Sequence, residues 1–186
     1  SLYIGATSLI LTNLNSNQEY DLITQTSDGE NMQIGVWIDY YSQESGFQAI
    51  NLTEYPNDIE IGDIDGDGDT DIVFTLIHSF HWGVIYNDGN GQFTEPTYYD
   101  LDFAPEIACG DINGDGKDDV AVGRGGEFKV YLKSETDFEI INIETIARIS
   151  GLNICDIDSD GSNEIIVIDS ALFGEFMKII IFEMDE

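Results

Sequence analysis

Basic residues are scarce in this chain. Its 186 residues include six Lys and Arg against 37 Asp and Glu, so the formal net charge is −31. A surface this acidic repels nucleic-acid phosphates and anionic lipid head groups, and it attracts cations. We therefore expect no nucleic acid partner and no membrane insertion.

Long apolar runs and cysteines are also few. No apolar stretch approaches the roughly 18 residues that a membrane-spanning helix needs. The N-terminal stretch SLYIGATSLILT has no basic segment, so we do not expect an intact signal peptide, although one could have been removed. Spacing alone does not establish a disulfide between Cys109 and Cys155, and we expect two small buried residues. Hydrophobic residues make up 42% of the chain, which favours a folded core over disorder.

Acidic residues gather in three short stretches of one pattern. These read DIDGDGDTD at 63–71, DINGDGKDD at 111–119 and DIDSDGSNE at 156–164. Each has Asp or Asn at positions 1, 3 and 5, Gly at position 6 and a carboxylate at position 9, and a β-rich apolar run follows. So many negative charges side by side repel one another strongly unless a cation lies among them.

A fourth, degenerate copy reads NLNSNQEYD at 13–21, so the pattern starts at residues 13, 63, 111 and 156. A period of this length indicates a repeat architecture. Around each copy, short runs of alternating apolar residues predict four β-strands per repeat, and NDGNG at 87–91 predicts a hairpin. We found no helical periodicity between them.

The sequence therefore predicts an all-β fold, a β-propeller of about four four-stranded blades. We expect a single domain over 1–186, with repeats at about 8–50, 58–100, 106–148 and 151–186. The last repeat stops after its third strand, and we expect residues 1–5 to complete that blade and close the ring. The alternative is a fragment of a larger propeller.

The three acidic loops resemble the FG-GAP or VCBS repeats of integrin α-subunit propellers and of many secreted proteins. The resemblance covers nearly the whole chain, strongly over 63–186 and weakly over 1–50. Families with this repeat commonly form seven-bladed propellers. If this chain is a fragment of a larger propeller, we expect that propeller to have seven blades. What the resemblance implies is one Ca²⁺ site in each intact loop.

The chemistry of the loops favours Ca²⁺ independently. Ca²⁺ takes six to eight oxygen ligands, and alternate carboxylates around a glycine turn supply them, whereas Mg²⁺ prefers a smaller shell rich in water. An EF-hand would need Glu at position 12, where this chain has Phe74, Val122 and Val167. The predicted ligands, with position 7 contributing its backbone carbonyl, are Asp63, Asp65, Asp67, Asp69, Asp71; Asp111, Asn113, Asp115, Lys117, Asp119; Asp156, Asp158, Asp160, Ser162 and Glu164. The degenerate loop Asn13–Asp21 is expected to stay empty, so about three ions bind.

The expected function is a calcium-stabilised, non-catalytic module for recognition or adhesion. Such sites are most useful where calcium is millimolar, which favours an extracellular, cell-surface or periplasmic location. We expect a protein or carbohydrate ligand on the rim opposite the calcium loops, where HSFHW brings His78, His81 and Trp82 together. Two alternatives are a carbohydrate-binding lectin and a propeller related to polysaccharide lyases, with His78 or His81 and Tyr86 as its base. No Ser or Cys stands in a nucleophile signature.

Overall fold

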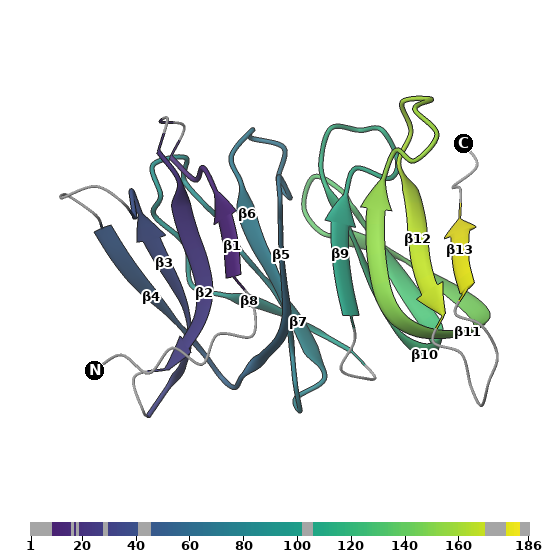
Figure 1. The fold of residues 1–186 in the computed structure, drawn as a ribbon, viewed down its shortest axis with the longest axis horizontal. Helices are drawn as coiled ribbons and strands as arrows, with labels where there is room; N and C mark the ends of the chain where they lie inside the picture. Colours follow the sequence, from purple (N-terminus) through teal and green to yellow (C-terminus); the bar gives the residue numbers. More distant parts are fainter. Residues whose placement is uncertain are drawn as a thin grey trace. The chain divides into compact units, whose positions relative to one another are not determined.

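A computed structural model describes residues 9–15, 17, 19–27, 30–40, 46–101, 106–169 and 178–182. Every regular element among these residues is a β-strand, and the strands form antiparallel sheets (Figure 1). No helix in this part of the chain is long and apolar enough to cross a bilayer. The predicted all-β class is confirmed.

The first two repeats each form a four-stranded meander, in which neighbours in the sequence are also neighbours in the sheet (Figure 1). The first sheet consists of β1 (Leu9–Thr12), β2 (Asp21–Ser27), β3 (Met32–Ile38) and β4 (Gly46–Leu52). The second consists of β5 (Pro56–Gly62), β6 (Asp71–Leu76), β7 (His81–Ile85) and β8 (Thr97–Asp100). The central strands, such as β2 and β6, are buried along nearly their whole length, whereas the outer strand β1 alternates between more and less exposed side chains.

The third and fourth repeats run together in one sheet. Its order is β13-β12-β11-β10-β9, and its strands are β9 (Glu106–Gly110), β10 (Asp119–Lys133), β11 (Phe138–Cys155), β12 (Glu164–Asp169) and β13 (Lys178–Phe182). The N-terminal part of β11 pairs with β10, and its C-terminal part pairs with β12 after an irregularity between Ile149 and Gly151. One strand of 18 residues therefore serves as the last strand of one repeat and the first strand of the next.

The chain divides into two compact units, Ser1–Ile59 with Gly68–Ala104 and Glu60–Asp67 with Pro105–Glu186. In the first unit, buried aliphatic and aromatic side chains of the two meanders form the interior, among them Ile34, Phe74 and Trp82. In the second, Phe128 and Val130 of β10 pack with Ile165 and Val167 of β12. A single propeller domain stays a prediction, and the proposed closing strand at residues 1–5 lies outside the described residues.

Two details differ from expectation. Cys109 and Cys155 carry free thiols, as expected, but both are only half-buried. Trp82 was expected on a ligand-binding loop, and it lies instead fully buried in β7, with its ring stacked on Tyr99 at a centroid distance of 4.5 Å. Its neighbour His81 begins the strand, so the next side chain points to the opposite, buried face of the sheet.

Candidate metal centre

The acidic loops lie where the sequence predicts them. Each connects the first two strands of its repeat: residues 63–70 join β5 to β6, residues 111–118 join β9 to β10, and residues 156–163 join β11 to β12. The degenerate loop likewise joins β1 to β2. In this arrangement the ninth residue of the pattern is always the first residue of the second strand.

The first carboxylate of each loop organises the backbone around it. Asp156 accepts hydrogen bonds from the backbone N–H groups of Ser159 (2.6 Å), Asp160 (3.1 Å) and Gly161 (3.0 Å). Asp111 accepts the equivalent three, from Gly114, Asp115 and Gly116. Aspartate side chains favour such turns because they bond to backbone groups a few residues ahead.

Two residues in each turn have a left-handed backbone. The predicted glycines at position 6, Gly68, Gly116 and Gly161, have φ of +90°, +85° and +98°. Position 4 is also left-handed, and there the last loop has Ser159 at φ +66° in place of glycine. Glycine adopts this region without steric cost, so the pattern at position 6 was read correctly, whereas the requirement at position 4 was missed.

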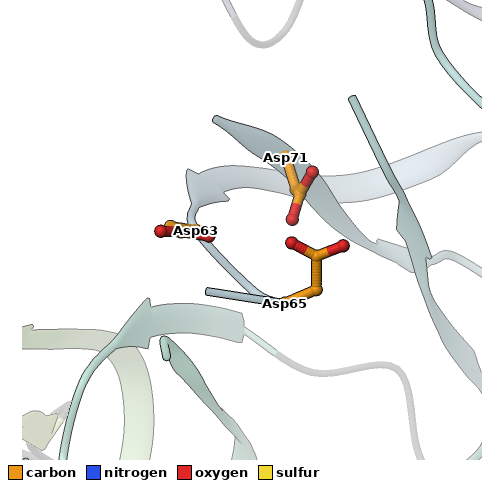
Figure 2. Close-up of side chains that lie close together, drawn as sticks. All are labelled: Asp63, Asp65 and Asp71. Carbon is orange, nitrogen blue, oxygen red and sulfur yellow. The ribbon is translucent and has the colours of Figure 1, made fainter. Parts of the chain in front are cut away.

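Carboxylate oxygens converge in two of the three intact loops. One group comprises Asp156, Asp158 and Glu164, and its ligand atoms lie within 4.8 Å of one another. Asp63, Asp65 and Asp71 form the equivalent group, in which Asp65 and Asp71 direct their oxygens toward each other (Figure 2). Three hard oxygen donors at this separation fit the ligand preferences of Ca²⁺.

The other predicted ligands do not belong to these two groups of three carboxylates. Among the described residues, the loop at 111–119 does not form such a group of three acidic side chains, because its third position is Asn113. At position 5, Asp115 and Asp160 each accept the N–H of position 7, at 2.9 Å in both loops. Asp67 lies outside the group in its loop. The backbone carbonyls of Asp69, Lys117 and Ser162 stay predicted ligands.

The ninth carboxylate has a structural role that the sequence interpretation missed. Asp119 is fully buried, its Oδ2 accepts the N–H of Ile112 at 3.0 Å, and its Oδ1 accepts the N–H of Lys133 at 2.6 Å. It therefore joins the loop to the last residue of β10. Because the two ends of β10 meet here, this element folds back on itself as a hairpin. A buried carboxylate that satisfies two backbone donors stabilises the fold with or without a metal ion.

The ninth residues of the other repeats also accept backbone hydrogen bonds. Asp71 accepts the N–H of Asn87 at 2.8 Å, and Glu164 accepts the N–H of Ile157 at 2.9 Å. In the degenerate loop, buried Asp21 accepts the N–H groups of Leu14 at 2.6 Å and Asp39 at 2.7 Å. This bonding gives Asp21 a structural role in a loop whose positions 1, 3 and 5 are asparagine.

Asparagine side chains of the degenerate loop bond to a carboxylate outside the loop. Asn15 and Asn17 donate their side-chain amides to Asp39 Oδ1, at 3.4 Å and 2.5 Å. The two amides are therefore bonded to the carboxylate of Asp39. The degenerate loop also carries fewer negative charges than the three acidic loops, so a cation would be attracted to it less. Gln18 lies outside the described residues. These contacts agree with the prediction that this loop binds no calcium, which stays a prediction.

Neighbouring loops are tied to one another within the second unit. Asp63 and Asp118 form a reciprocal pair: the Asp63 N–H donates to Asp118 Oδ2 at 2.9 Å, and the Asp118 N–H donates to the Asp63 carbonyl at 2.8 Å. One loop further on, Asn163 Nδ2 donates to the Asp111 carbonyl at 2.8 Å. Position 8 of a loop therefore holds position 1 of the preceding loop, which the sequence pattern alone did not indicate.

Without a cation the loops are electrostatically unfavourable. Burial raises the pKa of Asp119 to about 6, and it also raises the pKa of Asp118. Burial and the neighbouring charge of Asp67 raise the pKa of Asp65. All three shifts mean that the negative form of the carboxyl group is disfavoured in the folded, metal-free chain.

These shifts predict how the stability of the calcium-free protein depends on pH. A carboxyl group whose folded pKa is above its unfolded value binds more protons when folded, so the free energy of unfolding falls as pH rises through that interval. For Asp119 the interval runs from 3.8 to about 6. We expect urea denaturation in EDTA to show this decline, and Asp119→Asn to flatten it. A rise in stability over the same interval would contradict the prediction.

Calcium is expected to reverse this dependence. Ligand carboxylates must be deprotonated to bind a metal ion, so binding strengthens as pH rises. The same urea series in excess calcium should therefore show stability increasing over the interval where the calcium-free protein loses it.

The histidines of HSFHW lie at the end of the second sheet that is remote from Asp71. His78 is exposed, and its backbone N–H donates to Glu54 Oε2 at 2.9 Å. His81 Nε2 lies 3.1 Å from Asp100 Oδ1. Because Trp82 is buried, the three residues do not form the sugar-binding cluster that the motif suggested.

Comparison with known proteins agrees with the loop geometry. The family model described as an FG-GAP-like repeat matches residues 63–122 and 111–167, which together make up more than half of the chain. The chain belongs to the FG-GAP-like repeat family. Each matched segment of the FG-GAP-like chain runs from one acidic loop into the strand that follows the next loop. A comparison with curated proteins found no match.

A solved structure supports the fold of these FG-GAP-like repeats. The chain is similar to a crystal structure of BBS1N in complex with ARL6DN, soaked with lead, with a TM-score of 0.61 and 15% sequence identity. The similarity covers 89% of this chain and 47% of that chain, so the FG-GAP-like chain spans about half the length of this neighbour. At this level of identity the likeness shows the fold alone, which is a β-propeller arrangement of antiparallel sheets.

Proposed function

We propose that this β-propeller module binds about three calcium ions in its intact loops and serves in recognition or adhesion outside the cytoplasm. The observation that carries the proposal is the convergence of Asp156, Asp158 and Glu164 within 4.8 Å, on a loop whose backbone is already folded around Asp156. The equivalent group in the loop at 63–71 supports it. Ca²⁺ fits such a set of oxygen donors better than Mg²⁺, which demands a smaller octahedral shell.

Stabilisation is the first role of the ions in this proposal. Each loop connects the first two strands of its repeat, and links such as that between Asn163 and Asp111 join one loop to the next. A cation in a loop would neutralise the carboxylates that now disfavour one another, and it would hold these strand ends together. Ligands of this type suit millimolar calcium, which favours an extracellular, cell-surface or periplasmic setting.

A non-catalytic role agrees with the chemistry of the described residues. The converging carboxylates are the predicted metal ligands, and Asp71 also satisfies a backbone N–H group in its interior position. The histidine that begins β7 is paired with Asp100. Binding of a protein ligand is therefore proposed as the biochemical role. The lectin alternative loses the ring of Trp82, one of the three residues expected to face a ligand.

Isothermal titration with CaCl₂ tests the calcium proposal. We expect about three ions per chain and the loss of about one of them in the Asp156→Asn, Asp158→Asn double variant. Glu95→Gln is the matched control, because Glu95 is an exposed carboxylate outside the loops. Binding heats that are absent, or that are equal in the double variant and in wild type, would overturn the proposal.

A further inference from the structure

The turn that joins β6 to β7 holds an exposed aromatic side chain in a strained conformation. Phe80 has φ +55°, a left-handed backbone that bulky residues rarely adopt, and its side chain is 50% exposed. Strain of this kind persists only where the surrounding structure enforces it, and it concentrates at functional positions. A glycine would satisfy this backbone without strain, so the aromatic ring itself is the feature that needs an explanation.

Hydrogen bonds on both sides enforce the conformation of this turn. The Ile77 N–H donates to the Tyr55 carbonyl at 3.1 Å, and the His78 N–H donates to Glu54 Oε2 at 2.9 Å. On the other side, the Leu101 N–H donates to the Phe80 carbonyl at 2.6 Å. The turn is therefore held before any ligand arrives, which lowers the entropic cost of binding at Phe80.

Other apolar side chains are exposed at the same end of this sheet. Tyr55 is 46% exposed and Ile77 is 37% exposed, and their backbones are joined by the hydrogen bond just described. We call Tyr55, Ile77 and Phe80 the Phe80 patch. The patch belongs entirely to one compact unit and to the segments that adjoin β5, β6 and β7.

Carboxylates border the Phe80 patch. Glu54 precedes Tyr55 in the sequence, and Asp100 stands opposite His81 in the pairing of β7 with β8, with its side chain 98% exposed. The whole chain adds a strong negative field, with a net charge of −31. Such a field accelerates the approach of cationic partners and repels anionic ones.

We infer that the Phe80 patch docks a basic segment of a partner protein. Arginine suits both features of the surface, since a guanidinium group stacks on an aromatic ring and pairs with a carboxylate. The ring of Phe80 is the anchor, and Asp100 and Glu54 receive the positive charges. This inference rests on the recognition role proposed above and is independent of calcium.

Fluorescence anisotropy with labelled peptides tests the docking surface. Three peptides share one length and one apolar content, and they are rich in Arg, uncharged or rich in Glu. We expect the Arg-rich peptide to bind best, and Phe80→Gly to weaken its binding by about tenfold or more. Phe47→Ser is the matched control, because Phe47 is 49% exposed in the same compact unit and lies on β4; it should leave binding unchanged.

Phe80→Gly also separates binding from folding. Glycine accepts the left-handed backbone, so this variant should unfold at the wild-type temperature or above it while binding is lost. Binding that survives in Phe80→Gly, that falls equally in Phe47→Ser, or that favours the uncharged or Glu-rich peptide would overturn the inference. If none of the peptides binds to protein that does bind calcium, the docking inference fails and the calcium proposal stands. If the Arg-rich peptide binds through Phe80 to protein that does not bind calcium, the docking inference stands and the calcium proposal fails.

Discussion

Chelation of calcium with EDTA is expected to lower the midpoint of thermal unfolding by about 15 °C or more. Each ion that binds only the folded chain adds about 2.7 kcal/mol at a hundredfold excess over its dissociation constant. Three such sites would contribute about 8 kcal/mol, and a chain of this size shifts by roughly 2–4 °C per kcal/mol. Circular dichroism during heating, with and without EDTA, measures this shift.

Variants of one loop show whether the shift comes from the acidic loops. The Asp156→Asn, Asp158→Asn double variant should lose about a third of the difference between calcium and EDTA, because one of about three sites is removed. Glu95→Gln should retain all of it. An unfolding temperature that is the same with and without EDTA would contradict calcium stabilisation, and so would a full shift in the double variant.

Replacement of Asp21 by alanine is expected to destabilise the protein by about 3 kcal/mol. Asp21 is buried and accepts two backbone hydrogen bonds, from Leu14 and Asp39. Alanine leaves both donors without this acceptor, and each unsatisfied buried group costs roughly 1–3 kcal/mol. Since the degenerate loop is predicted to bind no ion, the loss should be equal in calcium and in EDTA. Urea denaturation measures it in both conditions.

Glu19 provides the matched control for Asp21. It lies in the same loop, but it is exposed, so Glu19→Ala should change the free energy of unfolding by less than about 0.5 kcal/mol. Equal effects of the two variants would contradict the structural role of the ninth carboxylate. A loss in Asp21→Ala that appears only with calcium present would instead assign Asp21 to a metal site.

Much of the fold could be predicted because local signals were strong and repeated. Alternating apolar residues predicted strands such as β3, and the glycines of NDGNG predicted the hairpin in which Gly89 and Gly91 have positive φ. The position of the acidic loops followed from the same repeat. Three copies in register carried more information than any one copy, because an isolated stretch of Asp and Gly is typical of ordinary turns.

Features that depend on tertiary pairing escaped prediction. The stretch GRGGE at 123–127 lies inside the element β10, which has an irregularity between Gly125 and Glu127, and the bond from the Lys133 N–H to Asp119 means that β10 folds back here as a hairpin. Trp82 was grouped with the two histidines of HSFHW, although it belongs to β7. Pairing with neighbouring strands decides where each strand begins and ends, and one sequence does not show that pairing.

The dual use of the ninth carboxylate was hidden for a different reason. A residue type that suits a metal ion also suits two backbone N–H groups, so composition alone cannot separate the two roles. The informative signal was Asp21, which is acidic in a loop whose positions 1, 3 and 5 are all asparagine. The second donor, such as Lys133 for Asp119, lies at the far end of the hairpin and could be found only from the structure.

The continuity of β11 limits how this protein can be divided. Because a single strand from Phe138 to Cys155 closes one repeat and opens the next, a cut there would leave each piece with an open sheet edge. Duplication or shortening of the gene would then be tolerated more readily between β4 and β5, which belong to different sheets, than between the last two repeats. Those two repeats would be inherited as an inseparable pair.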